Sequence, residues 1–236
     1  MNNTIRLFGR QTKQEWVDLR TKILANPNDL TNWKEATKLL DQRLETRYFR
    51  PIDRILKMRI STGEGFAAMT LICSLIEFLQ SCYEGKTFQH GEKESKFIYG
   101  GSAKKFKDFL EQHEPFKTTF SKPLAKPMGK LKTFGDDFYS NVRCGLLHEA
   151  ATNNGWTIKT FGKSRGHNNY VDLTDESNKI IYRDNFFEVI KTYCESYKQQ
   201  ILDNKKDMNK QFLRDNFCRK LDSLCLIPDK TAKWWS

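Results

Sequence analysis

Apolar residues recur along most of this chain at the spacing of amphipathic helices. Five segments are predicted to be helical, residues 12–25, about 30–60, 61–85, 184–202 and 205–226, and the first two have a mixed pattern. The third segment is apolar on nearly every side, which is expected of a helix buried in the middle of a bundle. We therefore expect a mainly α fold, a helical bundle with 61–85 as its central helix.

One part of the chain has the pattern of strands instead. WTIKTFG, NYVDLTD and NKIIY indicate two or three short strands at about 156–182, separated by the turns GKSRGHNN and ESN. A small hairpin or meander is thus expected before the last core helix. The sequence predicts three consecutive parts: an N-terminal helical arm (1–60), a core with this β insertion (61–203), and a C-terminal helix and tail (204–236). The tandem Trp234 and Trp235 in the tail could dock on the body or on a partner.

The charge balance points to polyanions as partners. Forty Lys and Arg against 29 Asp and Glu give a formal net charge of +11 and a pI near 9.3. Nucleic acid is therefore the first partner to test, although many basic proteins bind nothing anionic. The six cysteines form no CxxC pair, which predicts reduced thiols. No signal peptide pattern or membrane span is seen, because the most apolar run is short and carries Glu77, so we expect a cytoplasmic protein.

Two basic stretches are candidate RNA contacts. In the first, side chains recur at four- and three-residue steps, along one helix face if the helix continues through Pro51: Arg43, Arg47, Arg50, Arg54 and Lys57. Proline is expected to break or restart the helix there. The face is either solvated charge, which we favour, or a stripe that follows phosphates. Under the second interpretation Arg47, Arg50 and Arg54 bind RNA.

The second basic stretch runs from Pro115 to Gly135 and contains no acidic residue. It carries five lysines interleaved with three phenylalanines and a methionine: Lys117, Lys122, Lys126, Lys130, Lys132, Phe116, Phe120, Phe134 and Met128. Pro123 and Pro127 predict an irregular loop. The composition suits single-stranded RNA, with charge on the backbone and rings under the bases. It equally suits a loop pinned to the core by its phenylalanines, which we favour. Lys126, Lys130 and Lys132 are the candidate RNA-binding lysines.

The residue patterns of the common catalytic sites are missing from this sequence. None of the four histidines is paired at metal-ligand spacing, no run of acids would hold two magnesium ions, and there is no GxSxG elbow. The GKS at 162–164 is not a phosphate loop, because Thr157 stands where the Walker pattern needs glycine. We therefore expect no metal and no cofactor.

Arg143 and His148, in NVRCGLLHEA, permit one metal-free reaction, which is cleavage of RNA by its own 2′-hydroxyl. Histidine can move protons near neutral pH, and arginine offers a planar cation to a phosphorane. The helix around them should begin with two acids and end at NNG, residues 153–155. In a straight helix five residues leave the two side chains about 140° apart. They could share a phosphate at a groove edge or between two copies of the helix, which the small Cys144 and Gly145 would let approach closely.

The order of elements resembles the HEPN superfamily. LIEFLQ is followed by a basic loop, FYSNVRCGLLHEA, a small β element and a long helix, and RYFRPIDRIL and GEGFAAMTLICSLIEFL look like stretches of a bacterial HEPN branch. The resemblance covers about residues 45–203 and rests most heavily on RCGLLH. It implies a helical bundle, often dimeric, whose R-x4-6-H motif cleaves RNA without a metal, in many cases within toxin or anti-phage systems.

For individual residues, the resemblance implies that Arg143 and His148 are the motif pair. Glu77 corresponds in kind to an acidic residue that some members carry on an earlier helix, and Asn141 is added to the RNA contacts. Cys144 departs from the polar residue usual after the motif arginine, and a thiol donates only a weak hydrogen bond. We expect an endoribonuclease that dimerises through the Arg143–His148 helix, with RNA as a partner and an antitoxin or defence protein as a further candidate partner. The alternatives are a non-catalytic module that binds RNA or protein, and a structural bundle in which Arg143 pairs with Glu77.

Overall fold

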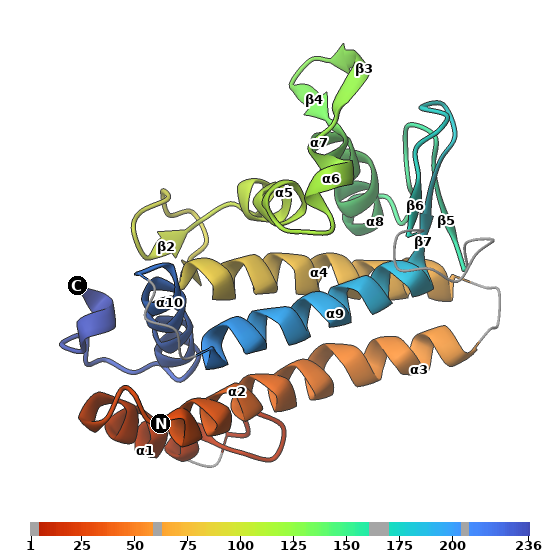
Figure 1. Cartoon of the computed structure of the whole chain (residues 1–236). Coiled ribbons are helices and arrows are strands. Elements are labelled where there is room, and N and C mark those ends of the chain that lie inside the picture. Colours follow the sequence, from red (N-terminus) through yellow and green to blue (C-terminus); the bar gives the residue numbers. More distant parts are fainter. Residues whose placement is uncertain (1–4, 59–62, 161–169, 204–207) are drawn as a thin grey trace. The chain divides into compact units, whose positions relative to one another are not determined.

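The computed structural model describes residues 5–58, 63–160, 170–203 and 208–236. The protein is mainly helical, as predicted (Figure 1). The α-helices are α1 (Lys13–Ala25), α2 (Leu30–Leu44), α3 (Arg50–Met58), α4 (Glu64–Glu84), α5 (Ser102–Gln112), α6 (Lys117–Phe120), α7 (Phe134–Phe138), α8 (Cys144–His148), α9 (Arg183–Leu202) and α10 (Met208–Leu224). Two π-helical turns, η1 (Glu45–Phe49) and η2 (Tyr139–Arg143), and a 3-10 turn, η3 (Lys233–Trp235), complete the helical part.

The strands are short and form three small sheets. They are β1 (Thr87–Phe88), β2 (Ile98–Tyr99), β3 (Pro123–Met128), β4 (Leu131–Thr133), β5 (Trp156–Lys159), β6 (Val171–Asp172) and β7 (Lys179–Tyr182). β1 pairs with β2 in parallel, and β3 pairs with β4 antiparallel. β7 lies in the middle of the third sheet, between β5 and β6.

The chain divides into two compact units that are interleaved along the sequence. The first unit comprises Met1–Pro51, Ser81–Gly101 and Glu195–Ser236, and the second comprises Ile52–Gln80 and Ser102–Cys194. The sequence-based division was into consecutive segments, whereas both ends of the chain belong to the first unit. The motif residues Arg143 and His148 belong to the second.

The helix that begins at Leu30 continues through Pro51, so the predicted break is wrong. α2, η1 and α3 follow one another without interruption to Met58. Proline has no N–H for the carbonyl four residues earlier. In the π turn that precedes Pro51, the Arg50 N–H donates to the Glu45 carbonyl five residues back, so the helix takes up one extra residue before the proline instead of ending.

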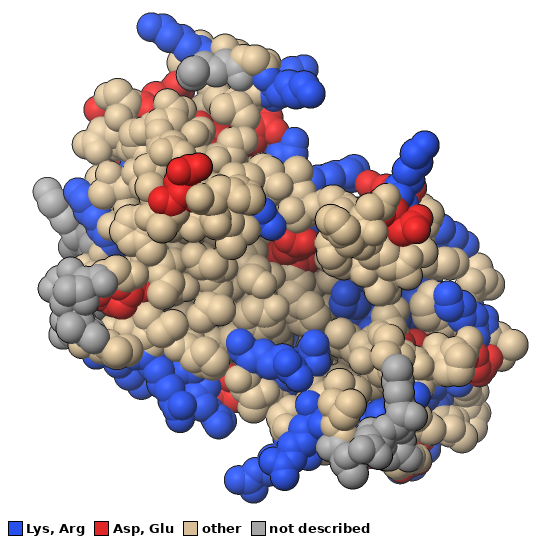
Figure 2. Space-filling model, turned by 180° about the vertical axis from the view of Figure 1, so that it is seen from behind, with Lys and Arg blue, Asp and Glu red and all other residues tan. Residues whose placement is uncertain are grey.

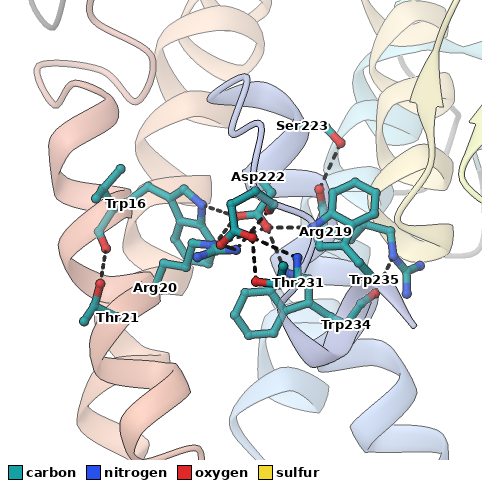
Figure 3. Close-up of polar contacts among 11 residues, drawn as sticks. Trp16, Arg20, Thr21, Arg219, Asp222, Ser223, Thr231, Trp234 and Trp235 are labelled. Carbon is teal, nitrogen blue, oxygen red and sulfur yellow. Dashed lines mark hydrogen bonds and ion pairs between the residues drawn. The ribbon is translucent and has the colours of Figure 1, made fainter.

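In the first unit, a buried carboxylate holds the two ends of the chain together (Figure 3). Asp222 of α10 is fully buried and accepts hydrogen bonds from the indole N–H groups of Trp16 (2.8 Å), Trp234 (2.8 Å) and Trp235 (2.9 Å). The Nε of Arg20 lies 3.1 Å from the same carboxylate. The tandem tryptophans of the tail therefore dock on the body of the protein.

The second unit has an aromatic core. Its buried rings come from α5, α6, α7, α9 and the strands around them: Phe106, Phe109, Phe116, Phe120, Phe138, Trp156, Tyr170, Phe186 and Tyr193. The rings meet mostly edge to face, as between Phe138 and Trp156 with centroids 5.0 Å apart. This core supports one side of the helix that carries the motif.

Within the described residues, α4 is the one helix long and apolar enough to cross a membrane. Of the window that passes this test, 61% is buried inside the protein. α4 is thus largely packed in the protein interior, as expected of a helix that is apolar on nearly every side.

The predicted strands near 156–182 are all present, but their pairing is not that of a simple meander. β7 lies parallel to β5 and antiparallel to β6, so β5 and β6 are not neighbours. Ile180 and Ile181 of β7 are buried, as expected for a central strand. The turn GKSRGHNN lies outside the described residues.

The stretch predicted as an irregular loop, 115–135, is instead the short helix α6 followed by the β3–β4 hairpin. The two prolines are compatible with this hairpin because both strands are edge strands, where a missing N–H is tolerated. Gly129, at φ +59°, supplies the left-handed turn residue at the tip. In Figure 1 the hairpin extends beyond α7.

Candidate active site

The helix that carries the motif begins with a capping box. The Thr133 hydroxyl accepts the Asp136 N–H at 3.1 Å, and the Asp136 carboxylate accepts the Thr133 N–H at 3.3 Å. α7, η2 and α8 then run without interruption to His148. The two acids at its start were predicted correctly.

The helix ends at His148, five residues before the predicted NNG. The N–H groups of Glu149 and Ala151 both donate to the Gly145 carbonyl, and Ala150 takes a positive φ of 51°. A non-glycine residue in this conformation leaves no signal in the sequence. The NNG residues form a separate turn before β5, with Asn154 and Gly155 at positive φ.

Arg143 is the last residue of the π turn η2, in which the Cys144 N–H donates to the Tyr139 carbonyl. π turns inside α-helices are frequent at functional sites. The Arg143 Nη2 lies 3.5 Å from the Glu77 Oε2 of α4, with side-chain exposures of 17% and 18%. The structure thus brings two of the three predicted catalytic residues together, and Glu77 has a charged partner.

Two neighbours of this ion pair were not singled out from the sequence. The guanidinium of Arg143 lies 5.4 Å from the centroid of the Tyr139 ring, and the Tyr139 hydroxyl lies 3.3 Å from the Ser102 hydroxyl. Burial raises the pKa of the Tyr139 phenol in spite of its hydrogen bond with Ser102. Tyr139 stands four residues before Arg143, so helical spacing could have pointed to it.

The second neighbour is Cys73, four residues before Glu77 on α4. Burial raises the pKa of its thiol to about 12, although the charge of Arg143 acts in the opposite direction. A thiol with this pKa stays protonated near neutral pH and is a poor nucleophile. Cys73 is therefore a chemically unreactive neighbour of the Arg143 charge.

His148 is exposed, whereas Arg143 is half-buried. The structure gives the His148 ring no hydrogen bond or ion pair with any described residue. This difference in exposure agrees with the wide angular separation predicted for residues five apart. The imidazole is accessible to a ligand from outside the chain.

The small size of Gly145 is needed by the turn that follows the motif helix in the same chain. A Cβ built there would lie 2.5 Å from the Ala151 carbonyl oxygen, so the glycine is required by the backbone that follows the helix. The expectation that its smallness admits a second copy of the helix therefore has a competing explanation within one chain. Cys144, beside it, is half-exposed.

Asn141 is held from within the protein. Its Nδ2 donates to Asp137 at 2.8 Å. Asp137 is fully buried and also accepts hydrogen bonds from Asn154 (2.9 Å) and from the Trp156 indole (2.7 Å), while Lys179 Nζ lies 2.9 Å away. The structure thus places Asn141 in a network that fixes the motif helix to the β5–β7 sheet.

The predicted lysines all lie on the surface of the β3–β4 hairpin. Lys126, Lys130 and Lys132 are exposed, and the blue side chains at the top of Figure 2 project from this hairpin. The phenylalanines of the same stretch are buried, with exposures of 0% for Phe116 and Phe120 and 5% for Phe134. The structure therefore shows these phenylalanine rings anchored in the core, which was the interpretation we favoured over stacking on RNA bases.

The predicted arginine stripe is less uniform. Arg43, its first member, is drawn inward, because its Nη1 donates to the Leu7 carbonyl at 2.9 Å. Arg47, Arg50 and Arg54 are exposed. Arg47 Nη2 lies 3.4 Å from the Arg6 carbonyl, and Arg50 Nε lies 3.4 Å from Glu45 Oε1.

Among the residues that the structure describes, no group of three or more His, Cys, Asp and Glu side chains could hold a metal ion. No protein-family model, curated protein or solved structure matches this chain. The resemblance to the HEPN superfamily therefore stays a prediction from the sequence.

Proposed function

We propose that this chain is a metal-independent endoribonuclease of the HEPN type, acting in the cytoplasm as a toxin or anti-phage effector. The observation that carries the proposal is the Arg143–Glu77 ion pair on the π turn of the motif helix. His148 stands exposed five residues further on, about 7.5 Å along the helix axis. A cation held by a carboxylate beside an accessible imidazole is the minimum that this reaction needs.

In the proposed reaction the neutral imidazole of His148 accepts the proton of a ribose 2′-hydroxyl, and the 2′-oxygen attacks the adjacent phosphorus. The bond from phosphorus to the 5′-oxygen breaks, and this oxygen takes up a proton. The products are a 2′,3′-cyclic phosphate and a 5′-hydroxyl. Arg143 stabilises the negative charge of the phosphorane, and Glu77 orients the guanidinium.

The wide separation of Arg143 and His148 favours a shared site. In a two-fold dimer through the motif helix, the arginine of one copy and the histidine of the other can reach the same phosphate. Light scattering of the purified protein tests this part of the proposal: a monomer at micromolar concentration contradicts it.

The reaction itself is tested with purified protein, structured and unstructured RNA, and EDTA, at several salt concentrations. We expect fragments with 2′,3′-cyclic phosphate ends from the wild type, and at least roughly 100-fold slower cleavage by His148→Ala, the lower range for loss of a general base. Glu149→Gln, an exposed change next to His148, is the matched control and should cleave normally. The proposal fails if the wild type cuts no RNA in EDTA, or if His148→Ala cuts as well as the wild type.

One observation favours a second candidate, a non-catalytic module that binds RNA or a partner protein. The Arg143 guanidinium already contacts Glu77 and the Tyr139 ring, so it could serve only the fold. In that case Arg143→Ala unfolds the protein, and the wild type binds RNA with strong salt dependence but does not cleave it. Circular dichroism of Arg143→Ala beside the cleavage assay separates the two candidates.

A further inference from the structure

The β3–β4 hairpin concentrates positive charge on an anchored ribbon, and we propose that it binds the phosphate backbone of a double-helical RNA stem. The choice of RNA rests on the proposed function, because only RNA carries the 2′-hydroxyl that the reaction needs. The inference deepens that function by naming the form of the substrate and the element that holds it.

The charge of the hairpin is not neutralised by the protein. Four exposed lysines lie on or directly before it: Lys122, Lys126, Lys130 and Lys132. The structure gives none of their ammonium groups an ion pair with a described residue. The 21 residues from Pro115 to Gly135 contain no acid. Such a surface attracts closely spaced anions.

Two acids that contact the hairpin, Asp136 and Glu176, are engaged in anchoring it. The Asp136 carboxylate binds Lys107 Nζ at 2.6 Å and the Lys132 N–H at 2.9 Å. Glu176 accepts the Ala125 N–H at 2.9 Å. These contacts fix the backbone at the base of the hairpin, so its lysines are presented on a preorganised ribbon, which lowers the entropic cost of binding.

The buried rings argue for a duplex over a single strand. Proteins that bind single strands without sequence preference stack bases on aromatic side chains. The three phenylalanines of this stretch are at most 5% exposed, so their rings are not available to stack on bases. What the hairpin offers is backbone contact alone. Double-stranded RNA is recognised mainly by shape and by phosphate and 2′-hydroxyl contacts, which suits a lysine ribbon without rings.

The position of the hairpin relates this contact to the proposed chemistry. β4 ends at Thr133, which caps the motif helix, and Arg143 follows ten residues later. Ten residues of helix span about 15 Å. A stem held at the base of the hairpin would therefore lie about 15 Å from Arg143. The hairpin would hold a stem while the cut falls in the RNA beside it.

The test uses the full chain carrying His148→Ala, so that RNA is bound but not cut. Fluorescence anisotropy measures the affinity for a 20-base-pair RNA duplex, a 20-nucleotide single strand and a 20-base-pair DNA duplex (about two helical turns) between roughly 50 and 300 mM salt. The variant adds Lys126→Gln, Lys130→Gln and Lys132→Gln. The control adds Lys22→Gln, Lys34→Gln and Lys38→Gln, three exposed lysines of the first unit with the same change in charge.

We expect the RNA duplex to bind at least about tenfold tighter than the single strand. The hairpin variant should lower the slope of log K against log salt by about 3, and the control by less than about 1. The inference is overturned if the single strand or the DNA duplex binds tighter than the RNA duplex, or if hairpin and control variants behave alike.

The outcome is separable from that of the proposed function. If the wild type cuts no RNA but the hairpin still binds the duplex with the expected salt slope, the nuclease proposal fails and this inference stands. If the wild type cuts RNA but the hairpin variant binds the RNA duplex as tightly as the control does, with the same salt slope, the inference fails alone. Unfolding curves of both triple variants should match that of the parent, because all six side chains are exposed.

Discussion

Two fully buried aspartates, Asp137 in the second unit and Asp222 in the first, are held by the same chemistry. Asp137 accepts an indole N–H at 2.7 Å and faces Lys179 at 2.9 Å. Asp222 accepts three indole N–H groups at 2.8 to 2.9 Å and faces Arg20 at 3.1 Å. A buried carboxylate is tolerated only when such donors replace its lost water.

The two networks differ in what they join. Trp16 and Trp234, which both bind Asp222, lie 206 residues before it and 12 residues after it, so this carboxylate closes the first unit across its two ends. The partners of Asp137 all follow it within 42 residues, up to Lys179. They belong to the motif helix, the turn before β5 and the β5–β7 sheet. The same kind of hydrogen bonds and ion pairs thus closes the first unit around Asp222 and holds the candidate site in place around Asp137.

The largest expected effect is that of Asp222→Ala. It leaves three indole N–H groups and Arg20 without their acceptor, and loss of one partner from a buried ion pair costs about 3–5 kcal/mol. We expect a fall of this size in the free energy of unfolding, measured by urea denaturation. A change below roughly 1 kcal/mol would mean that water replaces the carboxylate and that the network does not close the unit.

The matched control is Asp229→Ala. It removes the exposed carboxylate that is the second ion-pair partner of Arg20, and it should leave the unfolding curve nearly unchanged. Burial raises the pKa of the Cys225 thiol to about 12, with Asp222 adding to the effect, so this thiol should resist alkylation in the folded protein. Faster alkylation of Cys225 in Asp222→Ala, read by mass spectrometry, would locate the damage in the first unit.

Asp137→Asn should come next, with a loss of about 2–3 kcal/mol. The amide keeps the shape of the side chain but leaves Lys179, 2% exposed, without a counter-charge. Because Asp137 anchors the motif helix, we also expect cleavage per folded molecule to fall at least about tenfold, as displacement of a site by an ångström can cost more than that. Asp222→Asn is the control, and it should lose stability without this loss of cleavage. Equal effects of both variants on cleavage would contradict the difference drawn between the networks.

Single indole hydrogen bonds give a finer test. Trp156→Phe keeps a ring in the core but removes one donor from Asp137, and a hydrogen bond to a charged group contributes about 1.5–3 kcal/mol. We expect a loss of about 2 kcal/mol. Trp235→Phe removes one of three indole donors from Asp222 at a half-exposed position and should cost about 1 kcal/mol. If thermal and urea unfolding instead give the larger loss for Trp235→Phe, the exposure of the indole does not set the size of the effect.

The two networks also mark what the sequence could and could not predict. Helices were predictable, because their pattern is local: 12–25 was expected and Lys13–Ala25 is observed. The parallel pairing of β5 with β7 and the helix through Pro51 were not, because a distant strand and a π turn decide them. Neither of these two features produces a periodic pattern of apolar residues in the sequence.

The candidate site shows the same limit. Arg143 and His148 were found from their residue types and spacing, and Glu77 from its likeness to an acidic residue that some HEPN members carry on an earlier helix. Asp137 was read as one of two acids at a helix start, since its partners Trp156 and Lys179 are brought to it only by the fold. For the same reason Asn141 was assigned to RNA and not to this carboxylate.

The smallest effect concerns Asp136, the partly buried neighbour of Asp137 in the sequence. Burial acts to raise its pKa, but the hydrogen bond from Lys107 and the N–H groups of Lys132 and Thr133 outweigh this, so the pKa lies below its usual value near 3.8. A lowered pKa stabilises the fold above that value, and this contribution is lost as the pH falls through and below it. Since Lys107 is 34% exposed, solvent screening limits the contribution to under about 1 kcal/mol.

Unfolding of the wild type and of Asp136→Asn, compared between about pH 6 and pH 2.5, measures this contribution. The difference in unfolding free energy should be largest near neutral pH and shrink as the pH drops below about 4. In a Lys107→Met background most of the difference should disappear, because Lys107 is the first of the groups that oppose burial. A difference that stays constant with pH would instead assign the effect of Asp136→Asn to the geometry of the Thr133 capping box and not to the charge of the Asp136 carboxylate.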